Sequence, residues 1–115
     1  MTRISAKEAR ALLNQLGQKP RKEKGPLESE IQREIKDYLQ WHGWFIVKIH
    51  QSLGSYKGIA DLYALKNGRG VWIEAKTSKG VLSEHQKRFQ GDVEGHGGEY
   101  IVARGIEDVE GMVRG

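Results

Sequence analysis

Apolar residues recur at helical spacing in two stretches near the start of the chain. The first, residues 5–16, places leucine and alanine at intervals of three and four among charged positions, which predicts a short helix. The second, residues 27–43, reads LESEIQREIKDYLQWHG and predicts a longer helix that ends at its glycine. Between them, residues 17–26 hold both prolines among charged side chains, so this segment is expected to be a linker.

Short apolar runs bounded by glycine, asparagine and serine follow, and they predict strands joined by turns. The strands are expected at residues 44–52, 59–65, 71–78 and 97–105, and helices at residues 83–96 and 106–114. Residues 66–70, KNGRG, are typical of a hairpin turn. The order of helix, three strands, helix, strand and helix predicts an α/β fold with a small mixed β-sheet flanked by helices.

An acid lies inside the second predicted strand, and an acid and a base lie together in the third. Side chains alternate between the faces of a strand, so Glu74 and Lys76 point the same way. Asp61 shares a face with Tyr63 in a strand that is otherwise expected to be buried. The turn at residues 66–70 would fold the third strand back beside the second, so that Asp61 and Glu74 could converge on one side.

This arrangement of charges is typical of a metal site. A buried carboxylate is costly unless it is paired or bound to a metal. Because the chain has no cysteine, two carboxylates favour a hard ion with oxygen ligands, such as Mg²⁺. A lysine beside that ion can hold a phosphate oxygen or orient the attacking water.

Glutamates in the helix at residues 27–43 differ in the direction that they face. At 100° per residue, Glu28 falls inside the apolar arc that contains Ile35 and Leu39. Glu30 lies about 160° away from Glu28 on the same helix. We therefore expect Glu28 to face the sheet and Glu30 to face solvent. The alternative for Glu28 is a charge favoured by the helix dipole at an N-terminus.

Charge is unevenly distributed along the chain, whose formal net charge is +4. Residues 1–26 hold seven Lys/Arg against two Asp/Glu, whereas residues 27–115 hold twelve against thirteen. The sequence therefore divides into a basic N-terminal arm with a short helix and linker, residues 1–26, and a folded domain, residues 27–115. A basic arm suits phosphate binding, and a solvated tail is the alternative. Its candidates for contact with DNA are Arg21, Lys22 and Lys24.

Composition excludes several classes of protein. A length of 115 residues suits one domain, and the polar start MTRISAKEAR lacks the apolar core of a signal peptide. No apolar run approaches the roughly 20 residues needed to span a bilayer, so we expect a soluble, intracellular protein. Glycines at residues 91–98 lack the strand, lysine and helix context of a phosphate-binding loop, and no nucleotide cofactor is predicted.

The segment GIADLYALKNGRGVWIEAK, residues 58–76, resembles the core motif of the PD-(D/E)XK nuclease superfamily. Asp61, Glu74 and Lys76 match its two acids and its lysine. More narrowly, the chain resembles the virus-type replication-repair nuclease (VRR-NUC) family. The further cues are the early helix with glutamate, the G-x-x-DL motif, the EAKT motif, and LSEHQ with Gln86. The resemblance covers roughly residues 27–110.

The resemblance implies a restriction-endonuclease-like core and a metal-dependent DNA endonuclease. In such a site Asp61 and Glu74 bind Mg²⁺, which Mn²⁺ can replace, and the backbone carbonyl of Ala75 is a further ligand. Glu28 matches the helix glutamate of the family and would act on the metal through water. Lys76 would lie over the scissile phosphate, and family precedent is in-line attack by water that leaves a 5′-phosphate and a 3′-hydroxyl. Ala60 stands where the superfamily usually has proline, which is not a metal ligand.

Other candidates each have a structural alternative. Gln86 would lie near the active centre, but Ser83 and Gln86 also match a capping box. Contact with DNA is predicted for four residues outside the arm, and each could instead be an ordinary loop or surface residue: His50, Tyr56, Lys57 and Lys79.

Stand-alone members of the family look like junction-resolving dimers, so the resemblance favours branched DNA, a four-way (Holliday) junction above all, and a homodimer. Such a protein would act in the cytoplasm of a cell or, if phage-encoded, of a bacterial host. Trp41 and Trp44 are candidates for the dimer interface or for the core. The alternatives are a restriction-type duplex endonuclease and a DNA-binding module with the same fold that does not cut.

Overall fold

The computed structural model describes residues 25–51 and 56–114. The helix and nearly all of the linker expected in the arm lie outside these residues. Helix α2, Glu28–Trp41, buries Ile31, Ile35 and Leu39, which confirms the helical phase expected from the sequence. It begins after Leu27, whose N–H donates to Glu30 Oε1 at 3.4 Å, and is followed by Gly43 at a φ of 87°, a backbone conformation that glycine adopts readily.

A four-stranded sheet in the order β1-β2-β3-β4 forms the middle of the molecule. Strand β1, Phe45–Lys48, pairs antiparallel with β2, Leu62–Lys66, and β2 pairs antiparallel with β3, Arg69–Ala75. The turn between β2 and β3 is Asn67-Gly68, both with positive φ, as a tight hairpin with right-twisted strands requires. Strand β4, Glu99–Ala103, joins parallel to β3.

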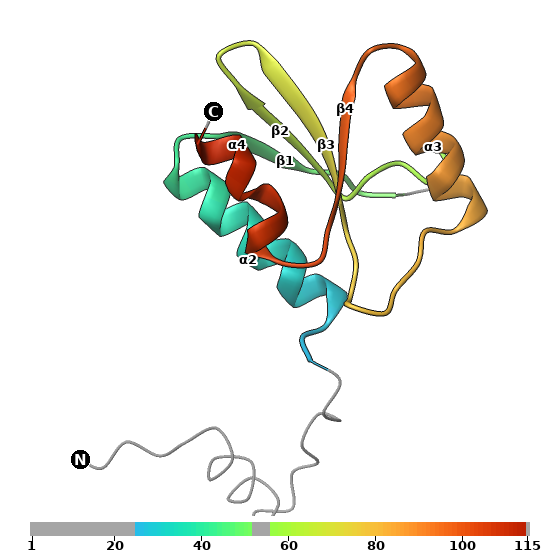
Figure 1. Ribbon diagram of the computed structural model, residues 1–115, viewed down its shortest axis with the longest axis horizontal. Coiled ribbons are helices and arrows are strands. Elements are labelled where there is room, and N and C mark those ends of the chain that lie inside the picture. The colour runs from blue at the N-terminus through green and yellow to red at the C-terminus, as the bar shows by residue number, and fades with distance from the viewer. Residues whose placement is uncertain (1–24, 52–55, 115) are drawn as a thin grey trace, which may run out of the picture.

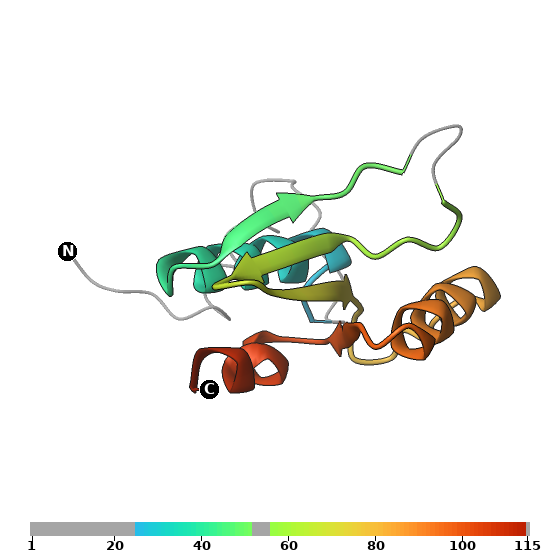
Figure 2. The ribbon, with the colours of Figure 1, turned by 90° about the horizontal axis from the view of Figure 1, so that it is seen from above.

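Helices cover the sheet on both sides. Figure 1 shows α2 and α4, Glu110–Arg114, on one side and α3, Glu84–Gly95, on the other. The 3₁₀ helix η1, Ile106–Val109, leads from β4 to α4. Seen from above, α3 and α4 lie at opposite ends of β4 (Figure 2). This α/β architecture confirms the predicted fold class.

Each face of the sheet has its own apolar cluster. The larger lies under α2 and joins its apolar residues to Leu62, Ala64, Val71 and Ile73. The smaller lies under α3 around Phe89, Tyr100 and Ala60. Within the described residues, no helix combines the length and the apolar character needed to cross a bilayer.

The observed strands are mostly shorter than predicted, and two of the differences bear on the site. Strand β1 ends at Lys48 and not at residue 52, so His50 lies beyond it. Asp61 lies one residue before β2 and not inside it. The Asp61 Oδ2 accepts the backbone N–H of Ala75 at 2.8 Å. The Asp61 side chain thus takes the place of the backbone hydrogen bonds between β2 and β3, whose pairing stops at Leu62 and Ile73. Of the two alternatives left open for Trp44, dimer interface or core, the structure supports the core, because the residue is 5% exposed.

Candidate active site

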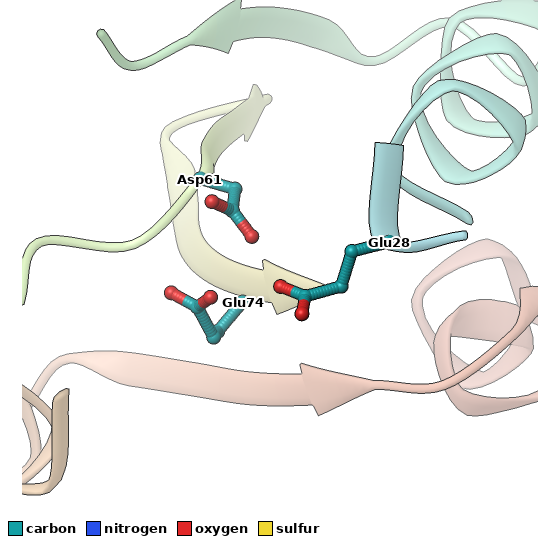
Figure 3. A group of neighbouring side chains, drawn as sticks. All are labelled: Glu28, Asp61 and Glu74. Atoms are coloured by element: carbon teal, nitrogen blue, oxygen red, sulfur yellow. The ribbon is translucent and has the colours of Figure 1, made fainter. Parts of the chain in front are cut away.

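Three carboxylates from separate parts of the chain meet at one end of the sheet. Glu28 comes from the first turn of α2, Asp61 from the segment before β2, and Glu74 from β3 (Figure 3). One oxygen from each lies within 4.8 Å of the others. The pairing of Leu62 with Ile73 explains part of this convergence, because the next step of an antiparallel register sets Asp61 opposite Glu74.

The Glu74 carboxylate is almost completely removed from water, with 1% of the residue exposed. Its Oε2 accepts Gln86 Nε2 at 3.3 Å. Its Oε1 is buried and has no hydrogen-bond partner among the described residues. A buried charged oxygen without a partner is costly, so this atom marks a place where a cation would be stabilising.

Burial above all, and then the neighbouring Asp61 carboxyl, raise the pKa of Glu74 from 4.5 to about 9, while Lys76 opposes the rise. Burial and a like charge both disfavour the ionised form of a carboxyl group. A divalent cation bound at this point would favour that ionised form.

The donor set fits a hard divalent cation. Three carboxylates gather without a histidine among them, and oxygen ligands are what Mg²⁺ prefers. The backbone of Ala75 also turns toward this point, because its N–H donates to Asp61 and not to β4. The Ala75 N–H therefore points to the side of the strand on which Asp61 lies.

Lys76 follows directly on the end of β3 and is 8% exposed. Its Nζ lies 3.9 Å from Glu28 Oε1, and its backbone N–H donates to the Ala103 carbonyl at 3.0 Å. The ammonium therefore stands on the Glu28 side of the cluster. Burying a cation is costly unless an opposite charge lies beside it, and Glu28 supplies one.

Gln86 makes both of the contacts considered for it, one with Ser83 at the start of α3 and one with the carboxylate cluster. Its N–H donates to Ser83 Oγ at 3.2 Å, and its Oε1 accepts the Ser83 N–H at 2.9 Å, which is the capping box of α3. The remaining amide nitrogen donates to Glu74 at 3.3 Å. The cap orients the side chain, because one amide has a single oxygen and the cap uses it.

Comparison with known proteins adds to this geometry. The family model described as archaeal Holliday junction resolvase (Hjc) matches residues 21–91, which is more than half of the 115 residues. The chain belongs to the archaeal Holliday junction resolvase family. No curated protein matches it. The residues matched include all three carboxylates, Lys76 and Gln86.

Two solved structures resemble this resolvase-family chain. One, a VRR-NUC domain, has a TM-score of 0.66 at 20% identity and covers 76% of this chain and 94% of its own. The other, a VRR-NUC domain protein, has a TM-score of 0.67 at 21% identity and covers 79% and 88%. At sequence identities this low, the structural similarity shows a common fold and no more. The resemblance to VRR-NUC nucleases is therefore confirmed at the level of the fold, and the chain belongs to a family of nucleases.

The structure describes four of the predicted DNA contacts of this resolvase-family chain. Tyr56, Lys57 and Lys79 are exposed, and His50 is exposed beyond the end of β1. The three basic residues predicted in the arm lie outside the described residues: Arg21, Lys22 and Lys24.

Sequence reasoning missed Tyr100 as a neighbour of the carboxylates. Its hydroxyl is buried without a partner among the described residues. Burial above all, and then the charges of Glu74 and Asp61, raise the pKa of Tyr100. Only the parallel register, with Tyr100 beside Trp72, brings it near these charges. No motif in the sequence could have indicated this.

Proposed function

We propose that the protein is a Mg²⁺-dependent endonuclease that hydrolyses phosphodiester bonds in branched DNA, with four-way junctions as its preferred substrate. The observation that carries this proposal is the cluster of three carboxylates within 4.8 Å, one of them with a buried oxygen that lacks a partner. The family description supports the choice of junctions.

Each side chain of the cluster has a proposed task. Asp61 and Glu74 bind the ion directly together with the Ala75 carbonyl, and Glu28, whose side chain is 49% exposed, acts through a water. When bound, a divalent ion lowers the pKa of a coordinated water and offsets charge on the phosphate. Gln86 holds Glu74 Oε2, so that the carboxylate keeps one orientation.

Lys76 is proposed to position the scissile phosphate. Its ammonium is buried at the edge of the cluster, where water screens its charge weakly. It can therefore donate to a non-bridging phosphate oxygen, or orient the attacking water, without first being desolvated. Its contact with Glu28 at 3.9 Å is long enough to be exchanged for one with phosphate.

We also propose that two copies act together, because symmetric incision of a four-way junction needs two active sites. Apolar surface is available at the edge of the sheet: Trp41 is 86% exposed and Phe45, at the start of edge strand β1, is 64% exposed. Exposed aromatic side chains of this size are typical of interfaces. The basic arm, residues 1–26, is proposed to add phosphate contacts to the nuclease domain, residues 27–115.

The proposal is tested with a labelled four-way junction and with linear duplexes of the same arm sequences, each with Mg²⁺ or with EDTA. We expect paired nicks in the junction with Mg²⁺, little cutting of the duplexes, and no cutting in EDTA. Binding without cleavage in both Mg²⁺ and Mn²⁺ would support a non-cleaving module. Cutting of one duplex at a fixed sequence would support a restriction-type enzyme.

Two glutamates two residues apart provide a matched pair of variants. Glu28→Gln should raise the Mg²⁺ concentration needed for half-maximal cleavage and lower the rate by about 10- to 100-fold, as loss of an outer-sphere partner of a metal does. Glu30→Gln should change the rate by less than about twofold. Its carboxylate accepts the Leu27 N–H at 3.4 Å, and a glutamine oxygen still accepts that bond.

The comparison needs cleavage rates over a range of Mg²⁺ concentrations and melting curves for both variants. Loss of activity in Glu30→Gln alone would mean that the assignment of these two side chains is reversed. Unchanged rates in both variants would mean that Asp61 and Glu74 hold the metal without help from α2.

A further inference from the structure

We infer that a hollow beside α3 binds a backbone phosphate of the DNA other than the one that is cut, and that Arg88 is its principal cation. The hollow has a volume of about 430 Å³ and is lined by Tyr56, Lys57, His85, Arg88 and Asp92; we call it the α3 hollow. This inference rests on the proposed function, because it assumes that DNA lies across the carboxylate cluster.

The walls of the α3 hollow are fixed against each other. Gly58 has a φ of 80° and lies so close to α3 that a Cβ atom there would collide with the backbone carbonyl of His85. The Tyr56 ring packs edge-on against Phe89, 5.4 Å between centroids, and its hydroxyl donates to Asp92 Oδ2 at 2.5 Å. A ligand therefore meets a preformed site and has little chain to order.

The lining carries positive charge that the protein does not neutralise. Within residues 25–51 and 56–114, neither Lys57 nor Arg88 forms an ion pair. Asp92 is engaged by the Tyr56 hydroxyl, and Arg88 lies close enough to that hydroxyl to lower the pKa of Tyr56 against the larger rise that Asp92 causes. Two cations and one acid leave a net charge of +1 with His85 neutral. Arginine forms two parallel hydrogen bonds with phosphate.

The first turn of α3 connects the α3 hollow to the carboxylate cluster. Gln86 on this turn reaches Glu74, while its neighbour His85 lines the hollow. At 100° per residue, His85, Arg88 and Asp92 fall within about 60° of one another on the helix. The first turn of α3 therefore borders both the carboxylate cluster and the α3 hollow. In this inference, a DNA strand bound at the carboxylates also runs across the α3 hollow.

Adjacent residues on α3 allow a matched test. Lys87 carries the same charge as Arg88, but its Nζ pairs with Glu84 Oε1 at 3.4 Å and it does not line the hollow. Affinity of the full chain for a four-way junction is measured in EDTA between 50 and 200 mM salt. We expect Arg88→Ala to reduce the log-log salt slope by about 0.9, which is about 3.5-fold over that range, for one lost phosphate contact. Lys87→Ala should leave the slope unchanged.

A scan of single methylphosphonates along the junction strands locates the contact. At one position near the cut, the neutral linkage should weaken binding of the wild-type protein and of Lys87→Ala, but not that of Arg88→Ala. Melting curves of both variants serve as the control for folding. Equal salt slopes for the two variants, or the same methylphosphonate pattern, would overturn the inference.

Failure of this inference is distinguishable from failure of the proposed function. Equal salt slopes for Arg88→Ala and Lys87→Ala, with intact cleavage in Mg²⁺, would refute the phosphate site but not the proposed nuclease activity. A wild-type protein that never cleaves DNA would refute the proposed nuclease activity, and the dependence of its salt slope on Arg88 would still test the phosphate site.

Discussion

Replacing Asp61 by asparagine or Lys76 by alanine should reduce junction cleavage by at least about 100-fold, the size of effect seen when one aligned charged group is lost from a transition state. Asparagine keeps the shape of Asp61 and an oxygen for the Ala75 N–H, but it removes the charge that a divalent ion requires. Alanine at position 76 removes the cation at the edge of the cluster. Junction binding should change little, because these side chains contact one phosphate among many.

Cleavage under single-turnover conditions and binding by gel shift in EDTA separate the two effects. Asp37→Asn and Lys87→Ala are matched controls, since both residues are exposed on helices and neither belongs to the carboxylate cluster. Near-normal turnover of either active-site variant with Mg²⁺ would show that the catalytic groups are assigned wrongly.

Replacing Glu74 by glutamine should abolish cleavage and also stabilise the metal-free protein at alkaline pH. The pKa of Glu74 rises from 4.5 to about 9 in the folded state, chiefly through burial. Between these values the folded protein keeps a proton that the unfolded chain releases. The free energy of unfolding therefore falls as the pH rises through this window, by up to about 1.4 kcal/mol per pH unit. Glutamine does not titrate, so its variant escapes this loss.

Urea unfolding in EDTA at pH 5 and pH 8 measures this difference. Wild type should lose stability between the two pH values, and Glu74→Gln should lose much less, so the variant is the more stable protein at pH 8. Mg²⁺ should then stabilise wild type and not the variant. Glu84→Gln, with a side chain 91% exposed, should behave as wild type. Parallel pH dependence in Glu74→Gln and wild type would refute the prediction.

Periodicity predicted which elements bring the carboxylates together, but not how exposed each one is. The 3.6-residue period put Glu28 in the arc of the buried Ile35 and Leu39, and Glu28 does join the cluster. Its side chain is nevertheless 49% exposed, and Glu30, which was expected to face solvent, is the less exposed of the two. The two-residue period put Glu74 and Lys76 on one side of the predicted strand, and both are buried polar residues, although β3 ends before Lys76. These signals are local, because each depends only on the path of one helix or one strand.

Contacts between elements decided what the sequence could not predict. Asp61 was placed inside a strand, yet its carboxylate replaces a backbone partner for Ala75, and no local pattern records that exchange. The strand around Tyr63 was expected to be buried as a whole, but only Leu62 and Ala64 on its other face are fully buried, because they pack against the apolar residues of α2. Tyr100 and the α3 hollow depend on the register of β3 with β4 and on the approach of Gly58 to α3.

The most direct test of the account is a crystal of the protein soaked in Mn²⁺ and measured at a wavelength where manganese scatters anomalously. We predict one strong anomalous peak in contact with the carboxylates of Asp61 and Glu74, with Glu28 reached through a water. The peak should be absent from crystals of Glu74→Gln. A soaked crystal with no peak among these side chains, or with a peak that persists in Glu74→Gln, would contradict the claim that the carboxylate cluster is a metal centre.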